Sequence, residues 1–328
     1  MKDTDTIEIS TFDPLLHNFP LPLRATLYPL GFPLDIHTNN PEILEMAEES
    51  WGACLQKFAK PPINIRIAVS EENTGEPPSA PVFRAQGHLL SIVSDAAHFA
   101  MCDLARGFAF CWLTQGATNA RVWTRHYFLD ALVYCCLNHL YVTAVHAGCI
   151  AKNGRGVLLC GPSGVGKSVL ALACARDGWS FVTDDVAYLV RGEESDTVVG
   201  KPDRMKFLTT AAALFPTVQW PQAAADHAGS PFLELRTENV HIATAPSCSA
   251  DFLVFLRRPK AGPARLIPID SNEALIRLLA DLPVFDKPVY AEHRRSVEIL
   301  SRVRAYELQY KHLAEAIPIL SQLAGDGS

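Results

Sequence analysis

Residues 161–168 read Gly161-Pro162-Ser163-Gly164-Val165-Gly166-Lys167-Ser168, and this stretch decides the fold of the chain around it. It satisfies the phosphate-loop pattern G-x-x-x-x-G-K-[ST] in full. Its glycines let the backbone turn tightly and direct several N–H groups toward one anion. Lys167 supplies a cation for the β- and γ-phosphates, and the Ser168 hydroxyl is a hard oxygen ligand of the kind that Mg²⁺ takes. The stretch therefore predicts binding of ATP, or another nucleoside triphosphate, with Mg²⁺.

The segments on both sides of this loop have the character that the motif requires. Val157–Cys160 is a short apolar run that predicts a strand. Val169–Asp177 is rich in Ala and Leu and predicts a helix, which Gly178 closes in the usual C-terminal position. A helix that starts at the loop adds unpaired N–H groups and the positive end of its dipole. We therefore expect a strand, a phosphate loop and a helix in succession.

A hairpin is expected directly before that strand. Val142–Ala151 reads as a strand, and Asn153-Gly154 is a strong hairpin-turn signal. Because a hairpin makes antiparallel neighbours, the sheet is expected to be mixed rather than wholly parallel. His146 lies on the first strand of this hairpin. A single strand histidine is more often structural than catalytic, so its interpretation depends on its neighbours.

Two adjacent carboxylates follow the next apolar strand. Trp179–Thr183 predicts that strand, and it ends on Asp184-Asp185. Such carboxylates can hold Mg²⁺ and can accept a proton from an attacking hydroxyl group. They also repel each other, and a bound Mg²⁺ together with Lys167 would relieve that repulsion. The plain alternative is a solvated turn after a strand, where Asp is common.

The remaining sequence predicts two domains. Residues 1–140 mix a helical stretch with strand candidates, which are Pro41–Phe58, Ile63–Val69 and His88–Val93. Residues 141–328 hold the loop and further elements, which are a strand at Asp251–Leu256 and helices at Glu273–Ala280 and Leu308–Leu323. We expect an α/β fold in which residues 141–328 form a mixed-sheet domain and residues 1–140 form a smaller α+β domain.

Composition excludes several classes of function. The net charge of −6 gives no basic field for nucleic acid or an anionic membrane. The most apolar long stretch, Tyr127–Val145, is interrupted by Asp130, Asn138 and His139, so it predicts a buried helix rather than a membrane span. The polar N-terminus does not resemble a signal peptide, and nine irregularly spaced cysteines indicate reduced thiols. We expect a cytoplasmic protein.

Several of these features together resemble a known family. His146-Ala147-Gly148, the Asn153-Gly154 turn, the loop, Gly178 and Asp184-Asp185 are similar in order and spacing to the catalytic domain of HPr serine kinase/phosphorylase. That family carries a histidine, a G-x-S-G-x-G-K-S loop, a glycine and an Asp-Asp pair. The resemblance covers roughly residues 142–190, and it marks the chain as a divergent relative, like the kinases of some peptide-maturation systems.

The resemblance implies a sheet of the HPr-kinase and PEP-carboxykinase type, and it implies roles for individual residues. His146, Lys167, Asp184 and Asp185 would be catalytic, and Ser168 and Asp184 would hold Mg²⁺. The family's E-I-R-G-L-G segment carries a further magnesium ligand. Glu234-Leu235-Arg236 could match its start, which would make Glu234 a third ligand, although Thr237-Glu238-Asn239 replaces the Gly-Leu-Gly.

The resemblance also implies an activity and partners. The chain would be an ATP- and Mg²⁺-dependent kinase that transfers the γ-phosphate to a hydroxyl group, expected to be serine, of a protein or peptide. The family often forms hexamers, so a homo-oligomer is one expectation. Two alternatives stay open: a nucleotide-binding sensor or scaffold with little turnover, and a kinase of a small metabolite.

Overall fold

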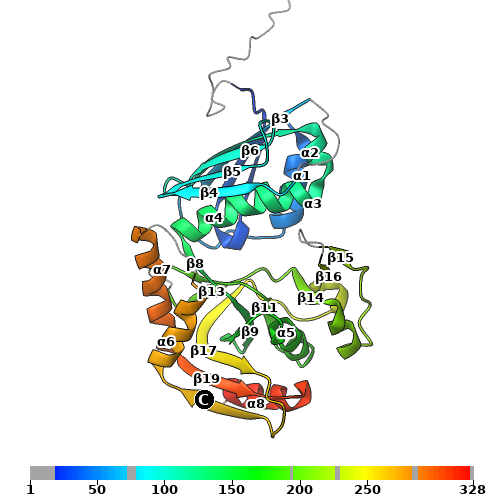
Figure 1. Cartoon of the computed structure of the whole chain (residues 1–328), viewed down its shortest axis with the longest axis vertical. Coiled ribbons are helices and arrows are strands. Elements are labelled where there is room, and N and C mark those ends of the chain that lie inside the picture. Colours follow the sequence, from blue (N-terminus) through cyan, green and yellow to red (C-terminus); the bar gives the residue numbers. More distant parts are fainter. Residues whose placement is uncertain (1–18, 72–78, 193–194, 226–229, 283–286, 326–328) are drawn as a thin grey trace, which may run out of the picture. The chain divides into compact units, whose positions relative to one another are not determined.

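The protein is described by a computed structural model that covers residues 19–71, 79–192, 195–225, 230–282 and 287–325 (Figure 1). The chain divides into two compact units, Met1–Leu140 and Tyr141–Ser328. The polar N-terminal stretch considered above lies outside the described residues. No helix in the covered ranges combines the length and the apolar character that crossing a membrane requires.

The first unit is built on a seven-stranded sheet in the order β1-β2-β3-β7-β6-β5-β4, in which β2, β3 and β7 run parallel. The strands are β1 (Leu23–Leu27), β2 (Leu34–Thr38), β3 (Ile63–Ser70), β4 (Val82–Gln86), β5 (Leu89–Val93), β6 (Phe99–Asp103) and β7 (Phe108–Thr114). Burial alternates along β2 and β3, so one face of the sheet is covered and the other is partly open.

Helices cover the buried face of this sheet (Figure 1). They are the short turn η1 (Pro29–Gly31), α1 (Pro41–Trp51), α2 (Gln115–Asn119), α3 (Arg121–Thr124), the π-helical segment η2 (Arg125–Asp130) and α4 (Ala131–Leu140). The side chain of Asn40 accepts a hydrogen bond from the Glu42 N–H and caps α1. The buried helix expected after Tyr127 is present and continues to Leu140.

The second unit is built on a nine-stranded mixed sheet. Its main path is β11-β9-β10-β17-β13-β12-β8, and β19 extends it beside β17 and pairs with β18. The strands are β8 (Val142–Val145), β9 (Ala147–Lys152), β10 (Arg155–Cys160), β11 (Ser180–Thr183), β12 (Ala187–Val190), β13 (Thr197–Val199), β17 (Ser247–Arg257), β18 (Arg265–Ile269) and β19 (Arg304–Gln309). Because β10 pairs in parallel with β17 and antiparallel with β9, the mixed sheet expected from the sequence is confirmed.

A smaller three-stranded sheet and the remaining helices complete this unit. The small sheet has the order β14-β16-β15, and its strands are β14 (Arg204–Leu208), β15 (Ala224–Ala225) and β16 (Pro231–Arg236). The helices are α5 (Lys167–Arg176), η3 (Thr209–Leu214), η4 (Thr237–Val240), α6 (Ser271–Ala280), α7 (Lys287–Leu300) and α8 (Leu313–Gly325).

Both faces of the nine-stranded sheet are buried, which explains why β10 reads as a continuous apolar run. Val157 and Leu159 pack in one core with α5 and α8. Leu158 and Cys160 point to the other face and pack in a second core with α6 and α7. A strand that is covered on both sides needs apolar side chains at successive positions rather than at every second one.

The expected hairpin before the loop is confirmed, although its first strand is shorter than expected. Asn153 and Gly154 both have positive φ, 54° and 80°, as a two-residue turn between β9 and β10 demands. The expectation of one continuous strand over Val142–Ala151 is wrong. The strand breaks at His146, because β8 pairs with β12 while β9 pairs with β10 and β11.

The last expected helix also starts too early. Leu308–Leu323 was expected to be helical, but Leu308 belongs to β19, and α8 begins only at Leu313. Register explains the difference, since Leu308 lies opposite Leu256 of β17 and opposite Leu266 of β18. Pairing on both sides fixes an extended backbone there, whatever the local helix propensity.

Candidate functional site

The loop between β10 and α5 has the backbone shape that its glycines allow. Gly161, Gly164 and Gly166 have φ values of 143°, 80° and 106°, a region that other residues rarely adopt. A side-chain carbon added to Gly164 would meet nothing within 4 Å, so the space beside this glycine is open. The loop therefore forms an open backbone cradle where the sequence predicts phosphate binding.

Helix α5 points its N-terminus into this cradle. Gly166 is the N-cap residue, and its position carries no side-chain cap for the first N–H groups of the helix. Uncapped N–H groups and the positive dipole end favour an anion there. At the other end Gly178 has φ 89°, and the Trp179 N–H donates to the Cys174 carbonyl, which is the expected glycine-terminated helix end.

Lys167 connects the loop with His146. The buried ammonium of Lys167 donates to the carbonyl of Gly161 at 2.8 Å and lies 3.0 Å from Nε2 of His146. Burial lowers the pKa of Lys167, while the carboxylates of Asp185, Asp281 and Asp184 oppose that effect. The ammonium thus lies where the loop and the carboxylates meet.

His146 bridges Lys167 and Asp185. Its Nε2 lies 3.2 Å from Oδ1 of Asp185, whose side chain is 64% exposed. The break between β8 and β9 places His146 at this position, because the residue belongs to neither strand. The structure therefore brings together three residues that the sequence separates: His146, Lys167 and Asp185.

Asp184 differs sharply from its neighbour. It is 8% exposed, and its Oδ2 accepts a hydrogen bond from the Lys206 N–H at 2.7 Å. Burial raises the pKa of Asp184 to about 7, and the charge of Asp185 adds to this effect. The Lys206 N–H and a hydrogen bond with Ser168 act in the opposite direction. A carboxylate with this environment is poised to ionise when a cation binds beside it.

The glycine of the His146-Ala147-Gly148 motif is explained by a close approach of the backbone. A side-chain carbon on Gly148 would lie 3.0 Å from the carbonyl oxygen of Asp184. Gly148 belongs to β9, and its absent side chain lets this strand lie tightly against the segment that carries the two carboxylates. A larger residue at this position would push against the Asp184 backbone.

The residues at the loop fit a nucleotide and a magnesium ion. Ser168 and Asp184 are hydrogen-bonded to each other and offer hard oxygen atoms beside the cradle. No cluster of three or more His, Cys, Asp or Glu side chains that could hold a metal occurs within the described ranges. Mg²⁺ commonly keeps several water and phosphate ligands and takes only one or two carboxylates, so a small set of protein oxygens suits it.

Glu234 lies one strand further from the loop. It is paired in register with Lys206, whose N–H binds Asp184. Its carboxylate forms an ion pair with Arg204 at 3.3 Å. The structure therefore brings Glu234 into the neighbourhood of Asp184 but directs it to Arg204, and its role as a magnesium ligand stays a prediction.

Three contacts at the site were not assigned from the sequence. The Lys206 contribution comes from its backbone N–H, which no sequence pattern marks. Arg258 donates from Nε to the Val165 carbonyl at 3.2 Å and stacks 3.9 Å above the Tyr310 ring, so it supports the loop. Asp281 lines a cavity beside His146. Arg258 follows directly after β17, and a basic residue at a strand end is a sequence signal for a contact at that edge of the sheet.

Comparisons with known proteins concern mainly the segment around this site. The family model of the HPr Serine kinase C-terminal domain matches residues 139–209. An HPr kinase/phosphorylase of Bacillus cytotoxicus is 45% identical over 67 residues, which are 20% of this chain and 21% of the relative. One of Shouchella clausii is 48% identical over 61 residues, 19% of each chain. The matches thus span about a fifth of the curated relatives, and the expected family resemblance is confirmed for this segment.

A solved structure, the Hpr(Ser) kinase/phosphatase from Coxiella burnetii, is similar over 56% of this chain and 99% of its own. The sequence identity is 16% and the TM-score is 0.28. The resemblance to the family rests on residues 139–209, and the matched relatives are named HPr kinase/phosphorylase.

Proposed function

We propose that this chain is an ATP- and Mg²⁺-dependent kinase, on the premise that residues 139–209 match the family model of the HPr Serine kinase C-terminal domain. It transfers the γ-phosphate to a hydroxyl group, and the proposed acceptor is a serine of a protein or peptide. The observation that supports this best is the chain of contacts from the loop through Lys167 and His146 to Asp185.

Each residue has a role that follows from its surroundings. The N–H groups of the loop and of α5 hold the phosphates, and Lys167 leaves its carbonyl partners to neutralise their charge. Ser168 and Asp184 would hold Mg²⁺, which supplies charge neutralisation at the phosphates. Asp185 is exposed and therefore accessible to an acceptor, whose hydroxyl proton it accepts.

His146 links nucleotide binding to the proposed base. Its Nε2 is close to both Lys167 and Asp185, but a single ring nitrogen cannot accept a proton from one and donate to the other at once. While the ammonium of Lys167 donates to Nε2, the imidazole cannot hold Asp185 by donation. When Lys167 turns to the phosphates, a protonated Nε2 can donate to Asp185 and orient it toward the acceptor.

Two measurements test this function. Calorimetry with Mg-ATP tests nucleotide binding, and absence of binding at saturating Mg²⁺ would overturn the proposal. Incubation with γ-labelled ATP and an extract of the source cells, followed by gel analysis, tests transfer. A labelled protein or peptide band is expected. Release of ADP without any labelled acceptor would favour the sensor or scaffold alternative, and a labelled small molecule would favour a metabolite kinase.

The role of Asp185 has its own test. Asp185→Ala is expected to lower the transfer rate by about 10²-fold or more while the affinity for Mg-ATP changes little, because the side chain is exposed and acts on the acceptor. Asp177→Ala, at an exposed aspartate after α5, is the matched control and is expected to transfer phosphate normally. Full transfer by Asp185→Ala would refute the assigned base.

A further inference from the structure

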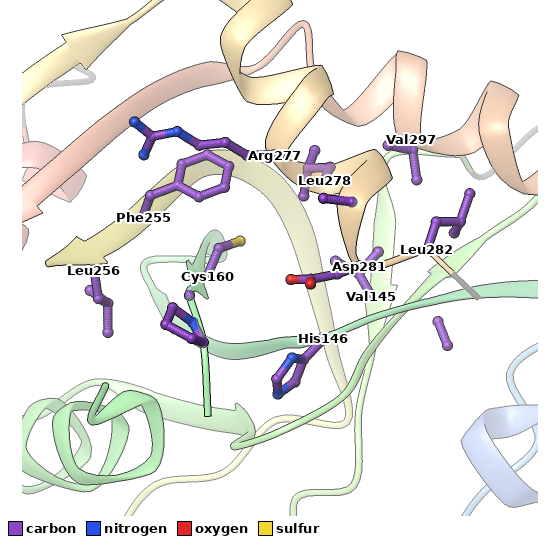
Figure 2. Close-up of a pocket in the computed structure, with 14 residues that line it drawn as sticks. Val145, His146, Cys160, Phe255, Leu256, Arg277, Leu278, Asp281, Leu282 and Val297 are labelled. Carbon is purple, nitrogen blue, oxygen red and sulfur yellow. The ribbon is translucent and has the colours of Figure 1, made fainter. Parts of the chain in front are cut away.

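A cavity of about 300 Å³ opens directly beside His146 and the first residues of the loop (Figure 2). It is lined from β8, from the ends of β10 and β17, and from α6 and α7. His146, Gly161 and Pro162 form the side that faces the loop. The cavity therefore adjoins the place where the proposed function puts the reacting hydroxyl group.

The walls of this cavity are mostly apolar. Val145, Phe255, Leu256, Leu278 and Val297 contribute aliphatic and aromatic surface. A volume of about 300 Å³ is at the lower end of the range for small-molecule sites. The space thus suits a single apolar side chain or a molecule of that size.

Two charged residues line the cavity, and only one of them is available. Arg277 is bound to Glu273 and, at 3.2 Å, to Glu307, and its guanidinium lies 5.1 Å above the Phe255 ring. Figure 2 shows this guanidinium directed away from Asp281. The described part of the chain offers the Asp281 carboxylate no ion-pair partner within 4.0 Å.

The Asp281 carboxylate is exposed, so a group bound in the cavity can reach it. Asp281 is the C-cap residue of α6, where the negative end of the helix dipole disfavours a carboxylate. It also shares its surroundings with Asp184 and Asp185, since all three act on Lys167. All three carboxylates act on the ammonium of Lys167, and the proposed function commits that ammonium to phosphate.

We propose that this cavity binds the phosphate acceptor, and that the acceptor carries a cationic group and an apolar group beside its hydroxyl. Asp281 binds the cation, the apolar walls bind the neighbouring group, and the hydroxyl lies toward His146 and Asp185. This inference rests on the proposed kinase function and adds the chemical class of the acceptor. A serine peptide with a neighbouring lysine or arginine has this chemistry, and so does a small amino alcohol.

The test uses the full chain, γ-labelled ATP and matched acceptors. One pair is leucinol and 4-methyl-1-pentanol, which share the apolar group and the hydroxyl but differ in the amine. The peptide set has one serine next to leucine, with lysine, norleucine or glutamate at the adjoining position. The pair of alcohols tests a small acceptor, and the peptide set tests a peptide acceptor. Initial rates give kcat/KM for each acceptor and KM for ATP.

The wild type is expected to prefer the cationic member of at least one set by about three- to fivefold, the size of an exposed ion pair. Asp281→Asn should abolish this preference, and Asp281→Lys should reverse it toward the glutamate peptide. Ala280→Leu, which adds volume at an exposed cavity residue, should raise KM for the acceptor by about tenfold or more and leave KM for ATP unchanged. Asp177→Asn is the matched control and should behave as the wild type.

Three results would overturn the inference. The first is a preference for the cationic acceptor that survives in Asp281→Asn. The second is an effect of Ala280→Leu on KM for ATP rather than on KM for the acceptor, which would make the cavity part of the nucleotide site. The third is transfer of label to extract proteins but to none of the cationic probes. Failure of the proposed kinase function would look different, because no acceptor of any kind would be labelled.

Discussion

Replacing Asp184 by asparagine is expected to stabilise the metal-free protein at neutral and alkaline pH. Asparagine has nearly the same shape, and its side-chain oxygen can still accept the hydrogen bond from the Lys206 N–H. What changes is the charge, because asparagine cannot ionise. The stability that the wild type loses by holding a buried carboxylate is therefore restored in the variant.

The size of the effect follows from the pKa. In the folded protein burial raises the pKa of Asp184 from its ordinary value of 3.8 to about 7. At pH values below 3.8 the carboxyl is protonated in both the folded and the unfolded chain, so it does not affect the free energy of unfolding. As pH rises toward about 7 the unfolded chain releases the proton first, so folding loses up to about 4 kcal/mol, at about 1.4 kcal/mol for each pKa unit. The variant should not show this loss.

The assay is calorimetric unfolding of both proteins across this pH range in the presence of a chelator. The free energies of unfolding should agree near the ordinary pKa of Asp and should diverge in favour of Asp184→Asn as pH rises through about 7. Asp185→Asn is the control, since its exposed side chain should change stability by less than about 1 kcal/mol at any pH. Parallel pH profiles for the wild type and Asp184→Asn would refute the raised pKa and the reasoning from burial.

Three further predictions concern Lys167, the glycines in and before the loop, and two buried cysteines. Lys167→Met should weaken binding of Mg-ATP by about tenfold or more, because the ammonium leaves the phosphate cradle, and an unchanged dissociation constant in calorimetry would contradict that role. In a urea titration, Gly166→Ala should lower the free energy of unfolding by about 1–3 kcal/mol, since φ is 106° and the new carbon would lie 2.9 Å from Nη2 of Arg258. Gly154→Ala, with φ 80° and open space around it, should cost less in the same urea titration, and equal costs would exclude the contact with Arg258 as the cause. Burial raises the pKa of Cys160 and of Cys174 to about 12, so both thiols should react far more slowly with iodoacetamide in the native protein than in urea, as mass spectrometry of the labelled peptides would show. Equal rates in the two states would mean that these cysteines are not buried.

Predictions that depend on neighbouring residues agree with the structure, and two that depend on strand pairing do not. The helix after the loop ends at Arg176 and is closed by Gly178, and the hairpin turns at Asn153-Gly154, as expected from residues that tolerate positive φ. The apolar run of β10 indicated a strand because both faces of that strand are buried. The break at His146 and the strand at Leu308 were not expected, because each depends on which strand lies alongside.

By itself the sequence determined the elements whose geometry is set within a few residues: the glycine-rich cradle, the helix that follows it, and the turn before it. These depend on backbone conformations that only certain residues adopt. The tertiary structure alone decided which groups surround the cradle. The Lys206 N–H on Asp184, the support of Arg258 beneath Val165, and the place of Asp281 near His146 come from segments far apart in the chain. Strand pairing and helix packing bring such groups together, and local sequence patterns do not show which distant segments will come into contact.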